Sequence, residues 1–163
     1  MSPKESFSFI NAYLGKMGPI IRENHGFIDK YIGDAIMALF INAEDALKAA
    51  MTMHEELLEF NKEREHQGFP VTKIGIGINT GELMLGIIGE QNRLQCTVIS
   101  DAVNVASRVE SLTKTYKTSL IISESTCKQL TEPSQYDIRF LDNIRVKGRS
   151  ERVKLFAVYR NSA

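Results

Sequence analysis

Residues 27–40 read FIDKYIGDAIMALF, and this stretch decides the first part of the fold. Two runs that favour extended structure, Phe27–Ile32 and Ala35–Ile41, stand on either side of the dipeptide Gly33-Asp34. A two-residue Gly-Asp connection is typical of a tight β-hairpin, because these residues tolerate the backbone angles that such a turn requires. We therefore predict a hairpin with Gly33-Asp34 at its tip.

Helical and extended patterns alternate on both sides of this hairpin. A capping serine at Ser2, a proline at the next position and Glu5 three residues after the cap predict a helix that ends near Gly26, with a weak point at Gly18-Pro19. The remaining predicted helices cover 42–67, 101–116 and 123–130, the last capped by Ser123. The remaining predicted strands cover 71–79, 83–88, 97–99, 120–122, 138–141, 144–147 and 153–159.

One of these strands has an unusual face. In 71–79 the isoleucines alternate with Gly75 and Gly77, so one face of the strand has almost no side chains. Another part of the chain is expected to approach the backbone closely there.

The order of elements predicts an α+β fold, with helices on one face of a largely antiparallel sheet. We expect a single domain over residues 1–163, because no internal repeat and no linker interrupts the pattern. The closest standard arrangement is a ferredoxin-like βαββαβ sandwich. That unit would need one more strand before the first helix, and we expect this first strand to be missing from the chain.

The composition is that of an ordinary globular domain and excludes several classes of protein. The 163 residues carry 20 basic and 20 acidic side chains, and a formal net charge of zero argues against nucleic acid or an anionic membrane as the main partner. Cys96 and Cys127 make no disulfide framework and favour a reducing compartment. The longest apolar stretch, 35–41, is too short for a membrane helix. We expect a cytoplasmic domain, although the full-length protein could be tethered to a membrane.

Several familiar patterns fail on inspection. The glycines of 75–81 do not fit a dinucleotide-binding loop, because the third glycine is displaced and no helical pattern follows. The spacing of Gly81 and Gly86 suggests a phosphate-binding loop, but Ile87 stands where that loop needs lysine. The three histidines and the two cysteines have no metal-ligand spacing.

A few polar residues could carry chemistry. Asp34 is a carboxylate at a strand end, where it could hold Mg²⁺ together with substrate phosphates, but a Gly-Asp turn is also ordinary by itself. Asn104 and Arg108 are four residues apart on a predicted helix and share a face, although most such pairs are simply solvated. By pattern alone, Lys30 is a solvated lysine and Thr97 a strand residue.

Four segments in order resemble one known family. The segments 29–40, 74–82, 97–108 and 144–148 resemble the catalytic domain of class III adenylate/guanylate cyclases, and the resemblance runs from about residue 3 to about residue 159. It implies the cyclase type of α+β fold and the conversion of ATP to 3′,5′-cyclic AMP and pyrophosphate for intracellular signalling. It also implies two Mg²⁺ or Mn²⁺ ions and a homodimer in which both chains build each site, with no nucleic acid and no membrane contact by this domain.

The resemblance assigns base recognition and metal binding to three residues. Lys30 and Thr97 match the positions that read the purine base, and threonine at the second position marks a subgroup of the family. An ammonium group donates to acceptors such as N1 of adenine, so Lys30 favours ATP over GTP. Asp34 matches one of the two aspartates that hold the metal ions.

The resemblance assigns the ribose and the phosphates to four others. Asn104 would orient the ribose, and Arg108 would stabilise the charge that develops on the phosphates, for which a planar and always charged guanidinium is suited. Lys147 would contact the triphosphate. Arg93, in a polar loop, is a weaker candidate for the same role.

The chain departs from the family pattern at its start. The family's other metal aspartate lies on a strand before the first helix, and neither is found here, so we expect an N-terminally truncated domain with weak or no activity of its own. A sheet without this strand exposes an unpaired edge, which could lead to a swapped dimer. The alternative is a non-catalytic nucleotide-binding or regulatory cyclase-homology domain. A diguanylate cyclase is disfavoured, because residues 32–36 read IGDAI instead of the GGDEF signature.

Overall fold

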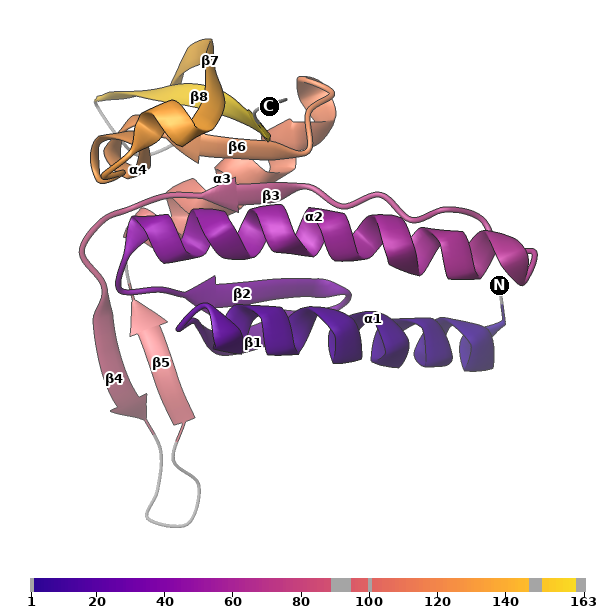
Figure 1. The fold of residues 1–163 in the computed structure, drawn as a ribbon. Helices are drawn as coiled ribbons and strands as arrows, with labels where there is room; N and C mark the ends of the chain where they lie inside the picture. The colour runs from indigo at the N-terminus through magenta and orange to yellow at the C-terminus, as the bar shows by residue number, and fades with distance from the viewer. Residues whose placement is uncertain (1, 89–94, 100, 147–150, 161–163) are drawn as a thin grey trace. The chain divides into compact units, whose positions relative to one another are not determined.

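The computed structural model describes residues 2–88, 95–99, 101–146 and 151–160, with 84–88 and 95–99 described by their backbone only. By its internal contacts the chain forms two compact units, Met1–Lys73 and Ile74–Ala163 (Figure 1). Each unit is described by itself below. The single domain over 1–163 stays a prediction.

The first unit combines two helices with a hairpin, in the order α1 (Pro3–Glu23), β1 (Phe27–Ile32), β2 (Ala35–Leu39) and α2 (Ala43–His66). The predicted capping box opens α1: the Glu5 N–H donates to the Ser2 hydroxyl at 3.1 Å, and the Ser2 N–H donates to the Glu5 carboxylate at 2.8 Å. Because these bonds satisfy N–H groups that a helix start leaves open, α1 begins where the sequence predicts.

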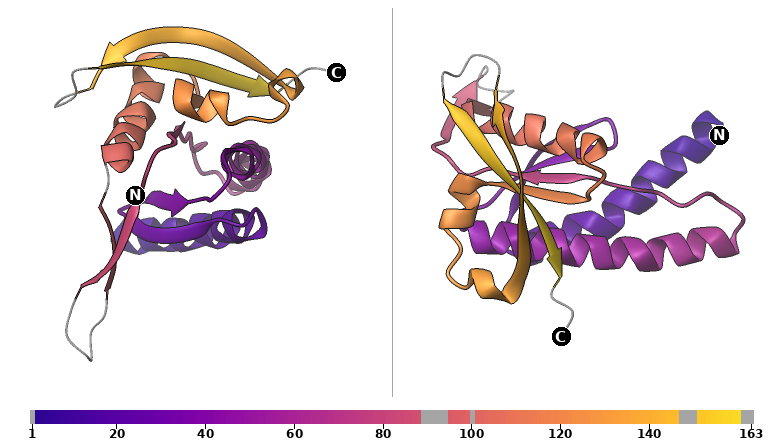
Figure 2. Two further views of the ribbon diagram at one scale, coloured as in Figure 1. Left: turned by 90° about the vertical axis from the view of Figure 1, so that its left-hand side faces the viewer. Right: turned by 90° about the horizontal axis from the view of Figure 1, so that it is seen from above.

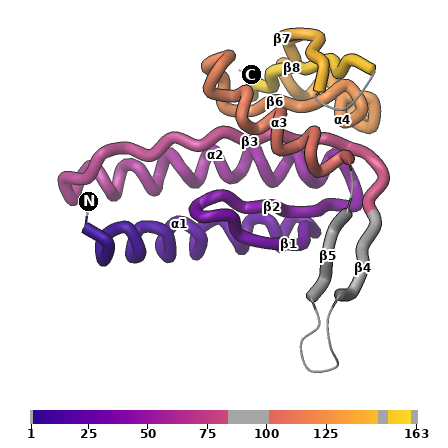
Figure 3. Tube along the Cα trace, turned by 180° about the vertical axis from the view of Figure 1, so that it is seen from behind, coloured from indigo at the N-terminus to yellow at the C-terminus, as the bar shows by residue number. Residues whose placement is uncertain are grey.

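The helices α1 and α2 contact each other within the first unit (Figure 3). At one end of this contact the ring of Phe60 lies 6.0 Å from that of Phe9 and 6.4 Å from that of Tyr13. The guanidinium of Arg64 lies 4.6 Å from the Phe9 ring centroid and 4.9 Å from that of Phe69. This cation–π cluster holds the segment after α2 against the two helices.

The predicted hairpin is confirmed. The strands β1 and β2 are antiparallel, and Ile32 pairs with Ala35, so Gly33-Asp34 alone closes the turn. Gly33 has a φ of +63°, a conformation that favours glycine. The structure adds a bulge in β1, because Ile28 pairs with Ala38 whereas Lys30 pairs with Met37.

The second unit contains the other elements: β3 (Ile76–Ile78), β4 (Met84–Ile88), β5 (Gln95–Ile99), α3 (Asp101–Thr115), β6 (Leu120–Ser123), α4 (Glu124–Lys128), the 3₁₀ turn η1 (Pro133–Gln135), β7 (Tyr136–Arg145) and β8 (Arg152–Arg160). Four strands form a sheet in the order β3-β6-β8-β7, in which β3 and β6 are parallel and the other pairs antiparallel. The strands β4 and β5 form a separate antiparallel pair. Figure 2 shows α3 and α4 on one side of the β7–β8 ribbon, as the predicted α+β class requires.

The strand predicted at 71–79 is shorter than expected, since β3 covers only Ile76–Ile78. The side chain of Asn61 on α2 takes the place of a neighbouring strand at Thr72. The Thr72 N–H donates to Asn61 Oδ1 at 2.8 Å, and Asn61 Nδ2 donates to the Thr72 carbonyl at 2.9 Å. The backbone at Thr72 is therefore satisfied without pairing in a sheet.

The two strands predicted at 138–141 and 144–147 are one continuous strand, β7. A register shift between Phe140 and Asp142 absorbs Leu141 as a bulge, so no turn is needed between the two halves. The turn predicted at 148–150 lies outside the described residues.

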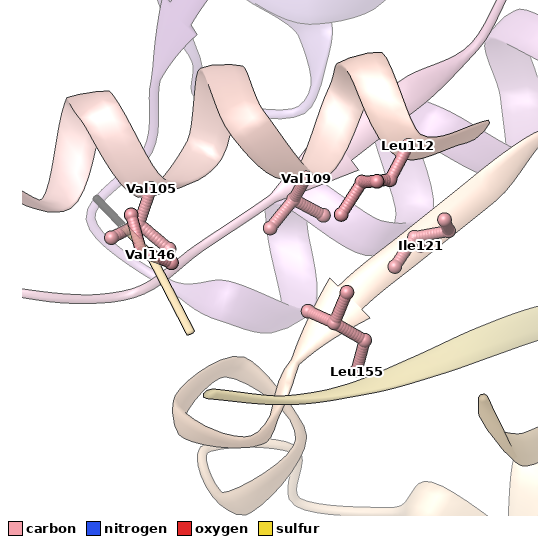
Figure 4. Packing of buried hydrophobic residues seen from close by; sticks show 6 residues of the cluster. All are labelled: Val105, Val109, Leu112, Ile121, Val146 and Leu155. Carbon is pink, nitrogen blue, oxygen red and sulfur yellow. The ribbon is translucent and has the colours of Figure 1, made fainter. Parts of the chain in front are cut away.

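The core of the second unit fixes which face of α3 points inward. Val105 and Val109 are completely buried, one helical turn apart, and pack with Leu112 of the same helix (Figure 4). Ile121 of β6 and Leu155 of β8 face them from the sheet, and Val146 completes the cluster. The residues beside Val105 and Val109 on α3 therefore face away from this core.

Candidate active site

Two of the predicted site residues lie on the β1–β2 hairpin. Lys30 is exposed, and the bulge before it means that strict alternation along β1 does not give its neighbours. The register now places Lys30 and Ile32 together and Ile28 on the other face. Asp34 is exposed at the tip of the same hairpin.

The negative charge of Asp34 contributes to a raised pKa at the buried phenol of Tyr13. Tyr13 on α1 is only 6% exposed, and burial raises its pKa to about 12, with a further contribution from the negative charge of Asp34. The tip of the hairpin thus lies close enough to α1 for the carboxylate to act on the Tyr13 hydroxyl. Tyr13 stays neutral at physiological pH.

Asn104 and Arg108 lie on the exposed side of α3, each directly before a buried valine. Among the residues that the structure describes, neither side chain makes a hydrogen bond or an ion pair. Two polar groups one helical turn apart thus project from α3 next to the face that is buried in the core. Exposed polar side chains are common on helices, and this pair is accessible to a ligand.

A hydrogen bond between side chains links the segment after the C-terminal end of α3 to β7. The Tyr116 hydroxyl donates to the Asp142 carboxylate, and this hydrogen bond is the main cause that lowers the pKa of Asp142 and raises that of Tyr116. The positive charge of Arg108 opposes the rise at Tyr116, so the guanidinium lies within electrostatic reach of the phenol. Sequence reasoning missed this contact, because the β7 bulge that precedes Asp142 has no local signature.

The remaining predicted residues are placed only in part. Thr97 lies on β5, where it pairs with Gly86 of β4. Lys147 and Arg93 lie outside the described residues. The structure thus brings together Lys30 and Asp34 on one hairpin, and separately Asn104 and Arg108 on one helix.

A buried polar cluster beside α3 was not predicted as part of the site. Ser123 occupies the N-cap position of α4 as expected, but its side chain makes no capping bond. Its hydroxyl donates instead to Asn79 Oδ1 at 2.6 Å. The signal that could have indicated this cluster is the pair of polar runs Asn79-Thr80 and Ser123–Thr126, each at the end of a strand.

Comparison with known proteins decides the family. The family model described as the adenylate and guanylate cyclase catalytic domain matches residues 1–159, nearly the whole chain and both units. The chain belongs to this family of cyclase catalytic domains. The resemblance inferred from the four sequence segments is confirmed.

Individual relatives agree with this assignment. An adenylate cyclase of Anabaena cylindrica is 47% identical over 97% of this chain, which spans 33% of that protein. The crystal structure of an adenylyl cyclase from P. aeruginosa has a TM-score of 0.85 at 27% identity and covers 99% of this chain and 85% of that one. The crystal structure of a guanylyl cyclase has a TM-score of 0.83 at 30% identity and covers 97% and 82%. The cyclase fold is therefore shown, and this fold serves enzymes named for either nucleotide.

Members of the family generally use divalent metal ions. In the described part of the chain, no group of three or more histidines, cysteines or carboxylates forms a self-sufficient metal site. The exposed carboxylate of Asp34 fits Mg²⁺ in the way that suits nucleotide enzymes, as one oxygen ligand whose partners are substrate phosphates and water. The described helices include none with the length and apolar character of a membrane span.

Proposed function

We propose that this domain converts ATP to 3′,5′-cyclic AMP and pyrophosphate. The ribose 3′-oxygen attacks the α-phosphorus, and a new P–O bond closes the ring. The bond from the α-phosphorus to the oxygen that bridges to the β-phosphorus breaks, and pyrophosphate leaves with that oxygen. The 3′-hydroxyl proton passes to solvent or to a phosphate oxygen, so no further reactant is consumed. The reaction needs positioning and charge stabilisation more than a covalent catalyst.

We assign recognition of the purine base to Lys30 and Thr97. The Lys30 ammonium is a donor only, so it suits N1 of adenine and opposes the N1–H of guanine. The exposure of Lys30 on the hairpin supports this role, because its donors are open to a ligand. A threonine hydroxyl donates and accepts, so Thr97 is compatible with adenine but selects less strongly than Lys30.

Asn104 and Arg108 act on the reacting part of the nucleotide. Asn104 orients the ribose, and Arg108 stabilises the negative charge that builds up on the α-phosphate and the leaving group, because a guanidinium makes paired bonds to phosphate oxygens. Lys147 and Arg93 would hold the triphosphate. The observation that carries the proposal is the exposed Asn104–Arg108 pair on α3, which has no hydrogen-bond or ion-pair partner among the described residues, with Val105 and Val109 buried next to it.

Asp34 would hold a divalent cation, Mg²⁺ or Mn²⁺, against the phosphates of the bound nucleotide. When bound, such a cation neutralises phosphate charge and stabilises the departing pyrophosphate. We further infer that two copies of the chain build each site, one supplying Lys30, Thr97, Asn104 and Arg108 and the other Asp34. The family resemblance supports this division. We place the domain in the cytoplasm, in agreement with its few cysteines.

The test is a product assay with the protein at its natural length, with ATP or GTP as substrate and Mg²⁺ or Mn²⁺ present. We expect cyclic AMP from ATP and a loss of at least about a hundredfold in kcat for Arg108→Ala. Lys114→Ala removes another exposed positive charge from the same helix and should keep near-parental activity. If Arg108→Ala and Lys114→Ala were equally active, the catalytic role of this helix face would be wrong.

A further inference from the structure

The proposed reaction depends on how α3 is held, because Asn104 and Arg108 make no bond within the described chain that would orient them. Among the described residues, it is therefore the helix backbone that fixes where each of these side chains leaves α3. The contacts that fix the distance of α3 from the sheet, its rotation and its register therefore help to position Asn104 and Arg108.

Glycines on and after β3 set the height of the helix. A Cβ atom added at Gly77 would lie 2.3 Å from the backbone nitrogen of Glu110, and one added at Gly81 would lie 2.8 Å from Ala102 Cβ. A Cβ this close would force its neighbour to shift, and at Gly77 that neighbour is helix backbone, so the backbones of β3 and α3 are in direct contact there. The expected close approach to the glycine face of this strand is thus made by α3.

A bare glycine surface controls distance better than rotation, because it offers no side chain to interlock with the helix. Asn79, between the two glycines, supplies the missing tie. Its Nδ2 donates to the carbonyl of Ala102 at 3.0 Å, in the first turn of α3 and two residues before Asn104.

The orientation of the Asn79 amide is determined by its surroundings. Oδ1 accepts hydrogen bonds from the hydroxyls of Ser123 at 2.6 Å and Ser125 at 3.2 Å. A flipped amide would place Oδ1 against the Ala102 carbonyl, and two acceptors repel each other. The N–H group therefore points to α3.

Of the two hydroxyls that bond Asn79, that of Ser125 is exposed, whereas that of Ser123 belongs to a buried polar cluster. Ser123 is 1% exposed and Thr126 completely buried, and their hydroxyls lie 3.3 Å apart. Thr126 also meets the Thr80 hydroxyl at 2.9 Å. The Ser123 side chain therefore does not cap α4. Its hydroxyl instead orients the Asn79 amide, whose Nδ2 bonds α3.

We propose that Asn79 is a positioning residue for the proposed cyclase reaction, which fixes the first turn of α3 and thereby the direction of Asn104 and Arg108. Asn79 does not touch the nucleotide in this account. Its effect reaches the substrate through the helix, so it should affect the step that Asn104 and Arg108 promote and leave base selection by Lys30 and Thr97 intact. This inference rests on the proposed function.

The kinetic test compares Asn79→Asp with Ser125→Ala. The aspartate keeps the shape of the side chain but replaces the N–H donor with an acceptor that faces the Ala102 carbonyl. We expect kcat for ATP to fall roughly ten- to a hundredfold, with KM and the ATP-to-GTP ratio nearly unchanged. Ser125→Ala removes only the longer bond to Oδ1, at 3.2 Å, and leaves the 2.6 Å bond from Ser123 and the bond from Nδ2 to Ala102 in place, so its kcat should fall much less than that of Asn79→Asp. Equal kcat values in the parent and Asn79→Asp would overturn the proposal.

A double variant separates positioning from a general loss of folded protein. If Asn79 acts through the helix face, Asn79→Asp should cost much less in an Arg108→Ala background than in the parent. A full multiplicative loss in that background would overturn the proposal. Asn79→Ala is measured in parallel, because it removes the donor without placing a charge beside Ala102, and it serves if Asn79→Asp fails to fold.

Hydrogen exchange gives a readout that does not need activity. Both Asn79 variants should speed exchange of the backbone amides in the first turns of α3, well below the melting temperature, while α2 exchanges as in the parent. Unchanged exchange in α3 would overturn the positioning role whether or not the protein is active. If the parent makes no cyclic nucleotide but α3 loosens as expected, the proposed function fails and the structural tie stands.

Discussion

The ammonium group of Lys30 carries three donors and no acceptor, and its position on an exposed hairpin leaves them free for a base. Replacing Lys30 by glutamate puts acceptors where the donors were. We expect the ratio of kcat/KM for ATP to that for GTP to fall by about tenfold or more in Lys30→Glu. Lys48→Glu makes the same charge change at an exposed position of α2 and should keep the parental ratio. A ratio that does not respond to Lys30→Glu would remove this residue from base selection.

The pKa of Tyr13 depends on the charge of Asp34, so a titration of this phenol tests whether the two side chains lie near each other. Its pKa of about 12 results from burial first and from the Asp34 charge second. Asp34→Asn removes the charge and keeps the burial, so the pKa of Tyr13 should fall but stay above 10. Phenolate absorbance measures this when the Asp34→Asn protein is compared with the Asp34→Asn, Tyr13→Phe double variant. An unchanged Tyr13 titration would mean that the tip of the hairpin is not beside α1.

The same phenol makes stability depend on alkaline pH. Below pH 10 the folded and unfolded states both keep the Tyr13 proton, and stability does not vary on its account. Between pH 10 and about 12 the unfolded state loses the proton first, so the free energy of unfolding should fall, in total by on the order of 2 kcal/mol. Tyr13→Phe should show a flatter dependence in chemical denaturation over this range. Parallel curves for the two proteins would contradict the buried phenol.

At the scale of elements, the contact between β3 and α3 makes a sharp prediction. Gly77→Ala forces a Cβ to within 2.3 Å of the Glu110 backbone nitrogen, which cannot move like a flexible side chain, so we expect a destabilisation of about 1–3 kcal/mol or more. Gly15→Ala is the matched control, because a Cβ there meets nothing within 4 Å inside α1. It should stabilise by about 0.5–1 kcal/mol. Thermal or chemical unfolding checks both, and a neutral Gly77→Ala would contradict the direct backbone contact.

Elements with a local signature could be predicted from the sequence, and those that depend on distant partners could not. The Gly33-Asp34 hairpin, the capping box at Ser2 and the bare glycine face of β3 are encoded within a few residues. The predictions of a longer β3 and of two separate strands in place of β7 were wrong because both features depend on contacts that are not local in the sequence. Asn61, eleven residues away, satisfies the backbone at Thr72, and a bulge joins the two halves of β7.

The candidate site shows the same division. The resemblance indicated Lys30, Asp34, Asn104 and Arg108 because the family repeats these residue types at fixed separations. It could not indicate Asn79, since the bond that orients its amide comes from a serine 44 residues later in the chain. Residues that touch substrate are visible in motifs, whereas residues that hold them in place are visible only in the fold.

At the scale of the whole molecule, the chain spans a third of the length of the Anabaena cylindrica adenylate cyclase and matches its cyclase family as a catalytic module. We propose that two copies of this module build each site. In that arrangement, Asp34 and Arg108 of any one site come from different chains. We therefore expect variants that lack one or the other to be inactive alone and to complement each other when mixed.

The most direct measurement mixes Asp34→Ala and Arg108→Ala proteins under conditions that let subunits exchange, and follows cyclic AMP formed from ATP. Random assortment makes half of the dimers mixed, and each mixed dimer holds one intact site of two, so the mixture should recover about a quarter of the parental activity. Each variant mixed with itself should stay inactive. A mixture that remains as inactive as its components, while the parent protein turns over ATP, would contradict the shared site.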